Sequence, residues 1–270
     1  MKYPIQKKRF RKRLRKRPKL KPIPRIVVPS FFTLMNLFSG FLSILMVADG
    51  NLVLGAWLIV LAGMFDVLDG FMARLANATS EFGVELDSIS DVVSFGVAPG
   101  FFVYSFAFHE LAIAGIILSA LPPICGAIRL ARYNVESKFE NELFFKGLPI
   151  PSLAIMIAAF YLTFMNRMEI FDGLNQGVIS VLIPIVILLS FLLVSTVPFD
   201  KIPKFDRASI RQYKNRLIIL FVYFLIIVFF QDIGLMFVFS FYILKGLGQG
   251  AFIFWKQAFT DEPDPLEDHI

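Results

Sequence analysis

Four aspartates lie inside apolar stretches of this sequence, at intervals that place them on two helix faces. Asp66 and Asp69 are three residues apart, and Asp87 and Asp91 are four residues apart. On a helix, side chains at these intervals share one face. An aspartate at the centre of a membrane helix costs about 2.5 to 3.5 kcal/mol on insertion scales, so each carboxylate needs a partner. Carboxylate oxygens prefer magnesium, manganese or calcium to zinc, so the pattern predicts a divalent cation site.

Small residues accompany the carboxylates. Gly70 and Ala73 follow the first pair, and Gly83 precedes the second. Such residues either let membrane helices pack closely or, beside a bound metal, make room for a ligand. Arg74 could pair with a phosphate as a planar fork, or could only anchor its helix at the membrane interface. A proton or cation relay in a transporter is the alternative function for the intramembrane acids.

The composition indicates the kind of elements that must hold these residues. Hydrophobic residues make up 57% of the 270 residues, charged residues make up 18%, and the mean hydropathy is +0.69. Roughly 25% charged residues is usual for soluble domains, so a soluble enzyme is excluded. At about 20 apolar residues per crossing, the chain has room for about eight membrane helices with short loops, which also excludes a single-pass receptor. The single cysteine, Cys125, lies in an apolar run and predicts packing rather than a disulfide.

Apolar runs between polar breaks predict an all-α, polytopic helix bundle. The candidate membrane helices are Ile26–Ala48, Leu52–Leu75, Phe82–Phe108, Leu111–Tyr133, Ile150–Met165, Val178–Val197, Leu217–Phe230 and Ile233–Trp255. With the amino terminus inside, this pattern places 25 of the 27 Lys and Arg residues on the inner side, as the positive-inside rule requires. Both termini and the site formed by the carboxylates are therefore expected to face the cytoplasm. The protein is expected to lie in the cell (inner) membrane.

The basic residues are concentrated in the amino-terminal arm, which holds 13 of the 27. A run of this kind could bind nucleic acid. Directly before an apolar helix it favours an anionic lipid surface instead, where each Lys or Arg is worth about 1 kcal/mol. We therefore expect anionic lipids, and no nucleic acid, as partners of this arm.

The full spacing of the acidic region resembles the signature of the CDP-alcohol phosphatidyltransferase family. The pattern reads Asp66-x-x-Asp69-Gly70-x-x-Ala73-Arg74, then eight residues, then Gly83-x-x-x-Asp87-x-x-x-Asp91. The resemblance implies a six-helix catalytic core, a homodimer, and two metal ions, Mg or Mn, on the four aspartates. It also implies that Asp91 is the general base, and that the enzyme transfers the phosphatidyl group of a CDP-linked lipid to an alcohol with release of CMP. The residues that the resemblance assigns to nucleotide or CDP-lipid binding are Ser30, Thr33, Asn36, Gly70, Ala73, Arg74, Ser80 and Gly83. Ser30 stands where the family often has Asn.

Three further stretches resemble the phosphatidylserine synthase branch of this family. They are Asn36 in the first apolar run, Arg129-Leu130-Ala131-Arg132-Tyr133-Asn134, and Gly147-Leu148-Pro149-Ile150-Pro151. The expected substrates are therefore CDP-diacylglycerol and L-serine. An amino-acid acceptor needs a cation for its carboxylate, and Arg129, Arg132 and Lys146 are the candidates. A related transferase that uses glycerol 3-phosphate or inositol phosphate stays open, as does an ion-coupled transporter.

This interpretation divides the chain into five parts. They are a basic arm 1–25, a catalytic core 26–197, a basic cytoplasmic loop 198–216, two additional membrane helices 217–255 and an acidic tail 256–270.

Overall fold

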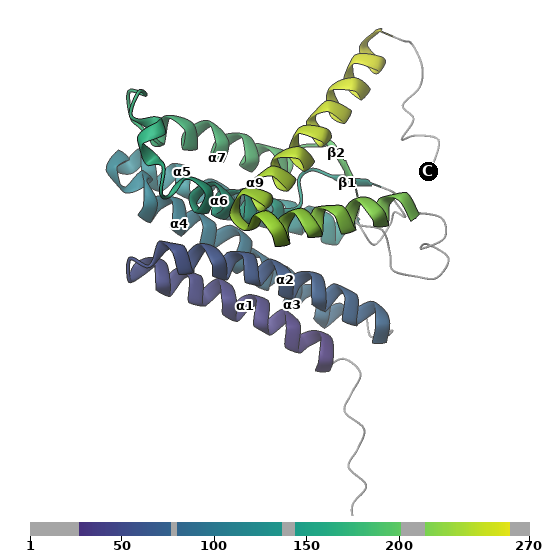
Figure 1. The fold of residues 1–270 in the computed structure, drawn as a ribbon. Coiled ribbons are helices and arrows are strands. Elements are labelled where there is room, and N and C mark those ends of the chain that lie inside the picture. Colours follow the sequence, from purple (N-terminus) through teal and green to yellow (C-terminus); the bar gives the residue numbers. More distant parts are fainter. Residues whose placement is uncertain (1–26, 77–79, 137–143, 201–213, 260–270) are drawn as a thin grey trace, which may run out of the picture.

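The computed structural model describes residues 27–76, 80–136, 144–200 and 214–259. The basic arm 1–25 and most of the acidic tail lie outside these residues. The longer helices are α1 (Val27–Ala48), α2 (Leu52–Ala76), α3 (Glu81–Asp91), α4 (Ala98–Phe106), α5 (Ile113–Glu136), α6 (Ile150–Phe164), α7 (Ile179–Val194) and α9 (Lys214–Phe259). The short elements are the π-helix η1 (Val92–Val97), the 3₁₀ helices η2 (Phe108–Leu111) and η3 (Met168–Phe171), and the strands β1 (Phe144–Lys146) and β2 (Pro198–Asp200). The helices form one elongated bundle (Figure 1).

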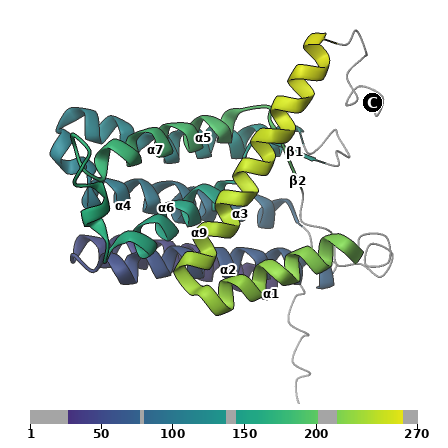
Figure 2. The same ribbon diagram turned by 45° about the horizontal axis from the view of Figure 1, so that its top comes forward.

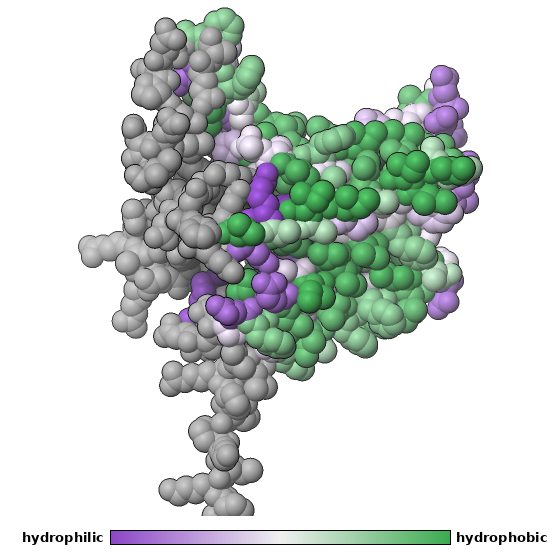
Figure 3. All heavy atoms as spheres, turned by 180° about the vertical axis from the view of Figure 1, so that it is seen from behind, coloured by the Kyte–Doolittle hydropathy of each residue, from purple (hydrophilic) through white to green (hydrophobic). Residues whose placement is uncertain are grey.

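The lengths and composition of the helices confirm a polytopic membrane protein. Five helices among the described residues are long and apolar enough to cross a membrane, namely 30–48, 52–75, 81–106, 108–135 and 221–256. Two shorter apolar helices, α6 and α7, have 15 and 16 residues. α9 is broken at Gln231 (φ 45°), so it contains the last two predicted helices. The surface is apolar between two polar ends (Figure 3), as a bilayer requires.

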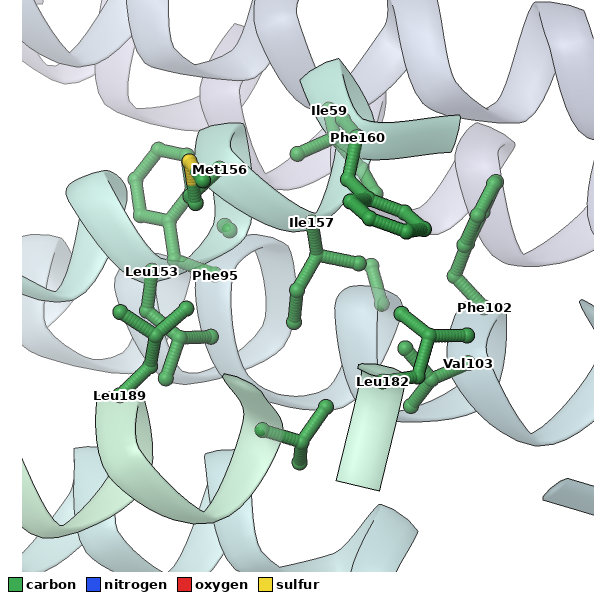
Figure 4. Packing of buried hydrophobic residues seen from close by; sticks show 14 of the residues in the cluster. Ile59, Phe95, Phe102, Val103, Leu153, Met156, Ile157, Phe160, Leu182 and Leu189 are labelled. Carbon is green, nitrogen blue, oxygen red and sulfur yellow. The ribbon is translucent and has the colours of Figure 1, made fainter. Parts of the chain in front are cut away.

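The core of the bundle surrounds α6. This helix packs against α2, α4, α7, α9 and η1, and most of its side chains are buried. Leu153 and Ile157 of α6 meet Ile59 of α2, Phe95 of η1 and Leu182 of α7 in one apolar cluster (Figure 4). A rigid centre of this kind fixes the spacing of α2 and η1, and α3 continues directly into η1.

The predicted helix Phe82–Phe108 is not one regular α-helix. A π-helical turn, η1, begins directly after Asp91, and within it the Ala98 N–H donates to the Val93 carbonyl, five residues back. Pro99 follows at the start of α4 and has no N–H to give to the carbonyl of Phe95. The wide turn absorbs this missing hydrogen bond directly after a candidate site residue, Asp91.

The fold class is all-α as predicted, with one short antiparallel ribbon added to the helices. Phe144, Phe145 and Lys146 of β1 pair with Asp200, Phe199 and Pro198 of β2. The predicted loop 198–216 therefore begins with a strand. The ribbon lies at the end of the bundle where α5 and α7 finish, beside the carboxyl-terminal half of α9 (Figure 2).

α1 lies across both helices that carry the aspartates. It packs along α2 and also contacts α3, η1 and α4. α1 comes close to η1 at Gly40, where an added Cβ would lie 2.6 Å from the Cα of Ser94. At the same crossing the Ser94 hydroxyl donates to the carbonyl of Asn36 at 2.9 Å. A glycine is therefore needed for α1 to reach η1.

We expect Gly40→Ala to lower the free energy of unfolding by about 1 to 3 kcal/mol, because the new methyl group overlaps backbone atoms that cannot rotate away. The midpoint of thermal unfolding in detergent measures this effect. Gly248→Ala is the matched control, since an added Cβ there meets nothing within 4 Å. Equal midpoints for the two variants would contradict the close approach of α1 and η1.

Candidate active site

Three carboxylates converge where α2 and α3 face each other. Asp66, Asp69 and Asp87 each offer an oxygen, and these oxygens lie within 4.8 Å of one another. Asp69 is 7% exposed, and the other two are half-buried. The start of α3 is held by Ser80, whose hydroxyl accepts from the Gly83 N–H at 3.0 Å. This cap begins the helix at the position that brings Asp87 opposite α2.

Asp91, the fourth aspartate, lies one turn further along α3 and outside this group of oxygens. It is 6% exposed, and its Oδ1 accepts from Asn36 Nδ2 at 3.1 Å. Thr33, one turn before Asn36 on α1, donates from Oγ1 to Asp69 Oδ2 at 2.7 Å. Thr33 and Asn36, which the family resemblance assigns to nucleotide binding, therefore each orient one carboxylate.

The donor set fits a divalent cation. The group offers carboxylate oxygens only, and Oδ1 of Asp87 is buried with no hydrogen-bond partner. A buried carboxylate oxygen without a donor is costly unless a cation faces it. Oxygen ligands favour Mg, Mn or Ca.

Two cationic side chains interact with the carboxylates. Arg129 of α5 is 7% exposed and interacts electrostatically with Asp66 and Asp91. Arg74 of α2 is exposed and interacts with Asp69. Its guanidinium lies over Gly70, where an added Cβ would be 3.5 Å from Nη1.

The other predicted acceptor residues differ in their surroundings. Arg132 donates to the carbonyl of Val194 at 2.9 Å and to that of Ser195 at 3.1 Å, which joins α5 to the end of α7. Lys146 lies in β1, but its side chain is outside the described residues. Arg129 is thus the candidate whose charge faces the aspartates.

The remaining predicted nucleotide residues lie on the same three helices, α1, α2 and α3. Ser30 is half-buried on α1, about one turn before Thr33. Ala73 of α2 and Gly83 of α3 are also half-buried. α1 begins, and α2 ends, at the same end of the bundle (Figure 1).

Sequence reasoning missed two polar residues that support the site. Ser94 holds the backbone of Asn36, as described above, and it follows Asp87 by seven residues, a helical interval that could have suggested its place. Asn134, for which the sequence predicted no separate role, donates from Nδ2 to Ser88 Oγ at 2.9 Å and links α5 to α3.

The family model for CDP-alcohol phosphatidyltransferase matches residues 26–193, and this chain belongs to that family. The match confirms the resemblance of the acidic motif and makes the chain a phosphatidyltransferase rather than an ion-coupled transporter.

Similar proteins point to one branch of the family. The chain is 33% identical over 238 residues to a CDP-diacylglycerol–serine O-phosphatidyltransferase of Helicobacter pylori, covering 88% of this chain and 96% of that protein. It is 36% identical over 178 residues to the protein of the same name from Methanocaldococcus jannaschii, covering 66% and 76%. It is 42% identical over 140 residues to an archaetidylserine synthase of Methanothermobacter thermautotrophicus, covering 51% and 59%.

Proposed function

We propose that this chain is a phosphatidylserine synthase, which transfers the phosphatidyl group of CDP-diacylglycerol to L-serine and releases CMP. The names of the similar proteins support serine as the acceptor, since two of them name serine as the group that receives the phosphatidyl group and the third names archaetidylserine as its product. The observation that carries the chemistry is the group of carboxylates between α2 and α3, with Arg129 facing it.

The reaction forms one bond and breaks one. The serine hydroxyl oxygen attacks the phosphorus that bears the diacylglycerol, and the bond from this phosphorus to the bridging oxygen breaks, so CMP leaves with that oxygen. Divalent cations, Mg or Mn, held by Asp66, Asp69 and Asp87 with Asp91 nearby, would neutralise the charge of the pyrophosphate. Arg74, exposed beside Asp69, would contact the phosphates, with Gly70, Ala73 and Gly83 leaving room for the nucleotide.

Asp91 would accept the proton of the serine hydroxyl. Asn36 holds one oxygen of its carboxylate in place, which leaves the other oxygen to act as general base. Because Asn36 is itself held by Ser94, the base is positioned through α1 and η1 together. The proton transfer is thus assigned to the aspartate that lies outside the group of three.

Arg129 would receive the serine carboxylate. A desolvated carboxylate next to an acidic site needs a cation, and Arg129 is buried and interacts electrostatically with Asp66 and Asp91. Arg132 already donates to two backbone carbonyls, so its first role is structural.

The proposed setting is the cytoplasmic side of the cell (inner) membrane. The charge asymmetry of the loops supports this orientation. The basic arm would bind anionic lipids, and the resemblance to the family supports a homodimer. Binding of the full protein to vesicles with and without anionic lipid tests the first of these, and its mass in detergent tests the second.

A labelling experiment tests the orientation. We expect a cysteine at His109, in the exposed turn at one end of the bundle, to react with an impermeant reagent in intact cells. A cysteine at Ser137 should react only after the membrane is opened. Cys125→Ala is the background for both variants, since the native thiol is the only one in the sequence. Labelling of the Ser137→Cys variant in intact cells would overturn the cytoplasmic site.

An acceptor screen tests the proposed function. Membranes that contain the protein are supplied with CDP-diacylglycerol and with serine, glycerol 3-phosphate or inositol phosphate in turn, and CMP release is measured. We expect release with serine alone. Release with one of the phosphorylated acceptors and not with serine would assign the chain to another branch of the family.

A further inference from the structure

Asn36 of α1 carries a buried hydrogen-bond acceptor that the proposed reaction does not use. The residue is fully buried, and among the described residues no group donates to its Oδ1. In the described part of the chain, the other amide or carboxylate oxygen with this property is Asp87 Oδ1, which we assign to the cation. A buried oxygen is costly when it stays without a donor, so Asn36 Oδ1 indicates a donor that arrives with the substrate.

Two hydrogen bonds fix the position of this oxygen. An ionised carboxylate only accepts hydrogen bonds, so the amide presents its Nδ2 to Asp91, 3.1 Å from Oδ1 of that carboxylate. Nδ2 and Oδ1 of Asn36 are bonded to the same carbon, so the unpartnered oxygen lies one amide width from the proposed base. The backbone is held as well, because the Asn36 carbonyl accepts from the Ser94 hydroxyl at 2.9 Å.

The cation ligands are a different group of atoms. The three carboxylate oxygens that we assign to the cation lie within 4.8 Å of one another, and Asp91 is not among them. Asn36 bonds to Asp91, whereas Thr33, one turn earlier on α1, bonds to Asp69 of the cation group. An acceptor beside the base and outside the cation group suits a substrate group that donates hydrogen bonds.

L-Serine carries such a donor next to its reacting hydroxyl. Its ammonium group has three N–H donors and no acceptor, and two carbon atoms separate it from the hydroxyl that Asp91 would deprotonate. We propose that Asn36 Oδ1 accepts a hydrogen bond from the serine ammonium, and so selects acceptors with an amine beside the hydroxyl. Glycerol 3-phosphate and inositol phosphate have no amine and would leave this oxygen buried and unpaired. The inference rests on the proposed function.

Asn36→Ala tests the proposal. We expect the KM for serine to rise about ten- to a hundredfold, because a charge-assisted hydrogen bond is lost. 3-Hydroxypropionate has the hydroxyl and the carboxylate of serine but no amine, so its inhibition constant against serine-dependent CMP release should not change. Both constants come from one preparation, so a fraction of inactive protein alters neither. An unchanged KM for serine, or equal weakening of both ligands, overturns the proposal.

Ser94→Ala is the matched control. It removes the hydroxyl that holds the Asn36 backbone and keeps the side-chain oxygen, so it should lower kcat and keep the ratio of the two constants. A change of this ratio as large as in Asn36→Ala would trace the effect to the position of α1 and overturn the proposal.

Ethanolamine separates the ammonium contact from the carboxylate contact, because it has the amine of serine and no carboxylate. Asn36→Ala should weaken inhibition by ethanolamine as much as it raises the KM for serine, and Arg129→Gln should leave this inhibition unchanged. If Arg129→Gln weakens inhibition by ethanolamine and Asn36→Ala does not, the proposal is wrong.

Two further measurements separate this inference from other roles of Asn36. The Mg or Mn concentration for half-maximal rate and the KM for CDP-diacylglycerol should stay unchanged in Asn36→Ala. A rise in either one, with the KM for serine unchanged, would assign Oδ1 to the cation or the nucleotide instead. If the wild-type protein uses serine but Asn36→Ala keeps its KM, only this inference fails. If the wild-type protein shows no serine-dependent release, the proposed function itself fails.

Discussion

Asp91→Asn is expected to lower kcat for CMP release by about 10² to 10⁴-fold while CDP-diacylglycerol still binds. The carboxylate lies outside the group of three, so its loss removes the proton acceptor and leaves Asp66, Asp69 and Asp87 to hold a cation. Release of CMP measures the rate, and titration of the purified protein with CDP-diacylglycerol in the presence of Mg or Mn measures binding.

Asp66→Asn is expected to differ from Asp91→Asn in kind. It removes an oxygen ligand from the group of three, so binding of the cation and of CDP-diacylglycerol should weaken together with the rate. Asp69→Asn and Asp87→Asn should behave like Asp66→Asn. Asp49→Asn, an exposed aspartate at the opposite end of the bundle, is the control and should keep wild-type behaviour. Equal binding defects in Asp66→Asn and Asp91→Asn would remove the special role of Asp91.

Arg129→Gln is expected to raise the KM for serine roughly ten- to a hundredfold, because a charge-assisted hydrogen bond to the substrate carboxylate is lost. The KM for CDP-diacylglycerol should change little. Two saturation curves per variant, one in each substrate, measure the difference.

Arg132→Gln is the informative comparison for this prediction. It removes donors to the carbonyls of Val194 and Ser195, so it should lower the midpoint of thermal unfolding rather than the affinity for serine alone. Lys146→Gln completes the set. If all three variants keep the wild-type serine curve, the acceptor pocket lies elsewhere, and the segment with Ser195, Thr196, Lys201 and Lys204 is the next place to test.

Much of the site could be predicted from helical intervals. The pair Asp66 and Asp69 and the position of Asp87 required only a periodicity of 3.6 residues and two adjacent helices, and their convergence is confirmed. The polar pair Gln231 and Asp232 likewise indicated the break in α9. Strong periodicity and long apolar runs make such features predictable.

Other features depend on contacts that no local pattern records. The π-turn after Asp91 arises from Pro99, eight residues later, and strands of three residues are too short for any alternation to be visible. The contacts of Thr33 and Asn36 with carboxylates depend on how α1 crosses two other helices.

Incorporation of labelled L-serine into lipid tests the central claim most directly. The purified protein is supplied with CDP-diacylglycerol, Mg or Mn and labelled serine, and the organic phase is counted for the wild type and for Asp69→Asn. The account predicts label in phosphatidylserine for the wild type, in equal amount to the CMP released, and none for the variant. Wild-type protein that releases CMP without placing serine in lipid, or an Asp69→Asn variant that incorporates serine at the wild-type rate, would contradict it.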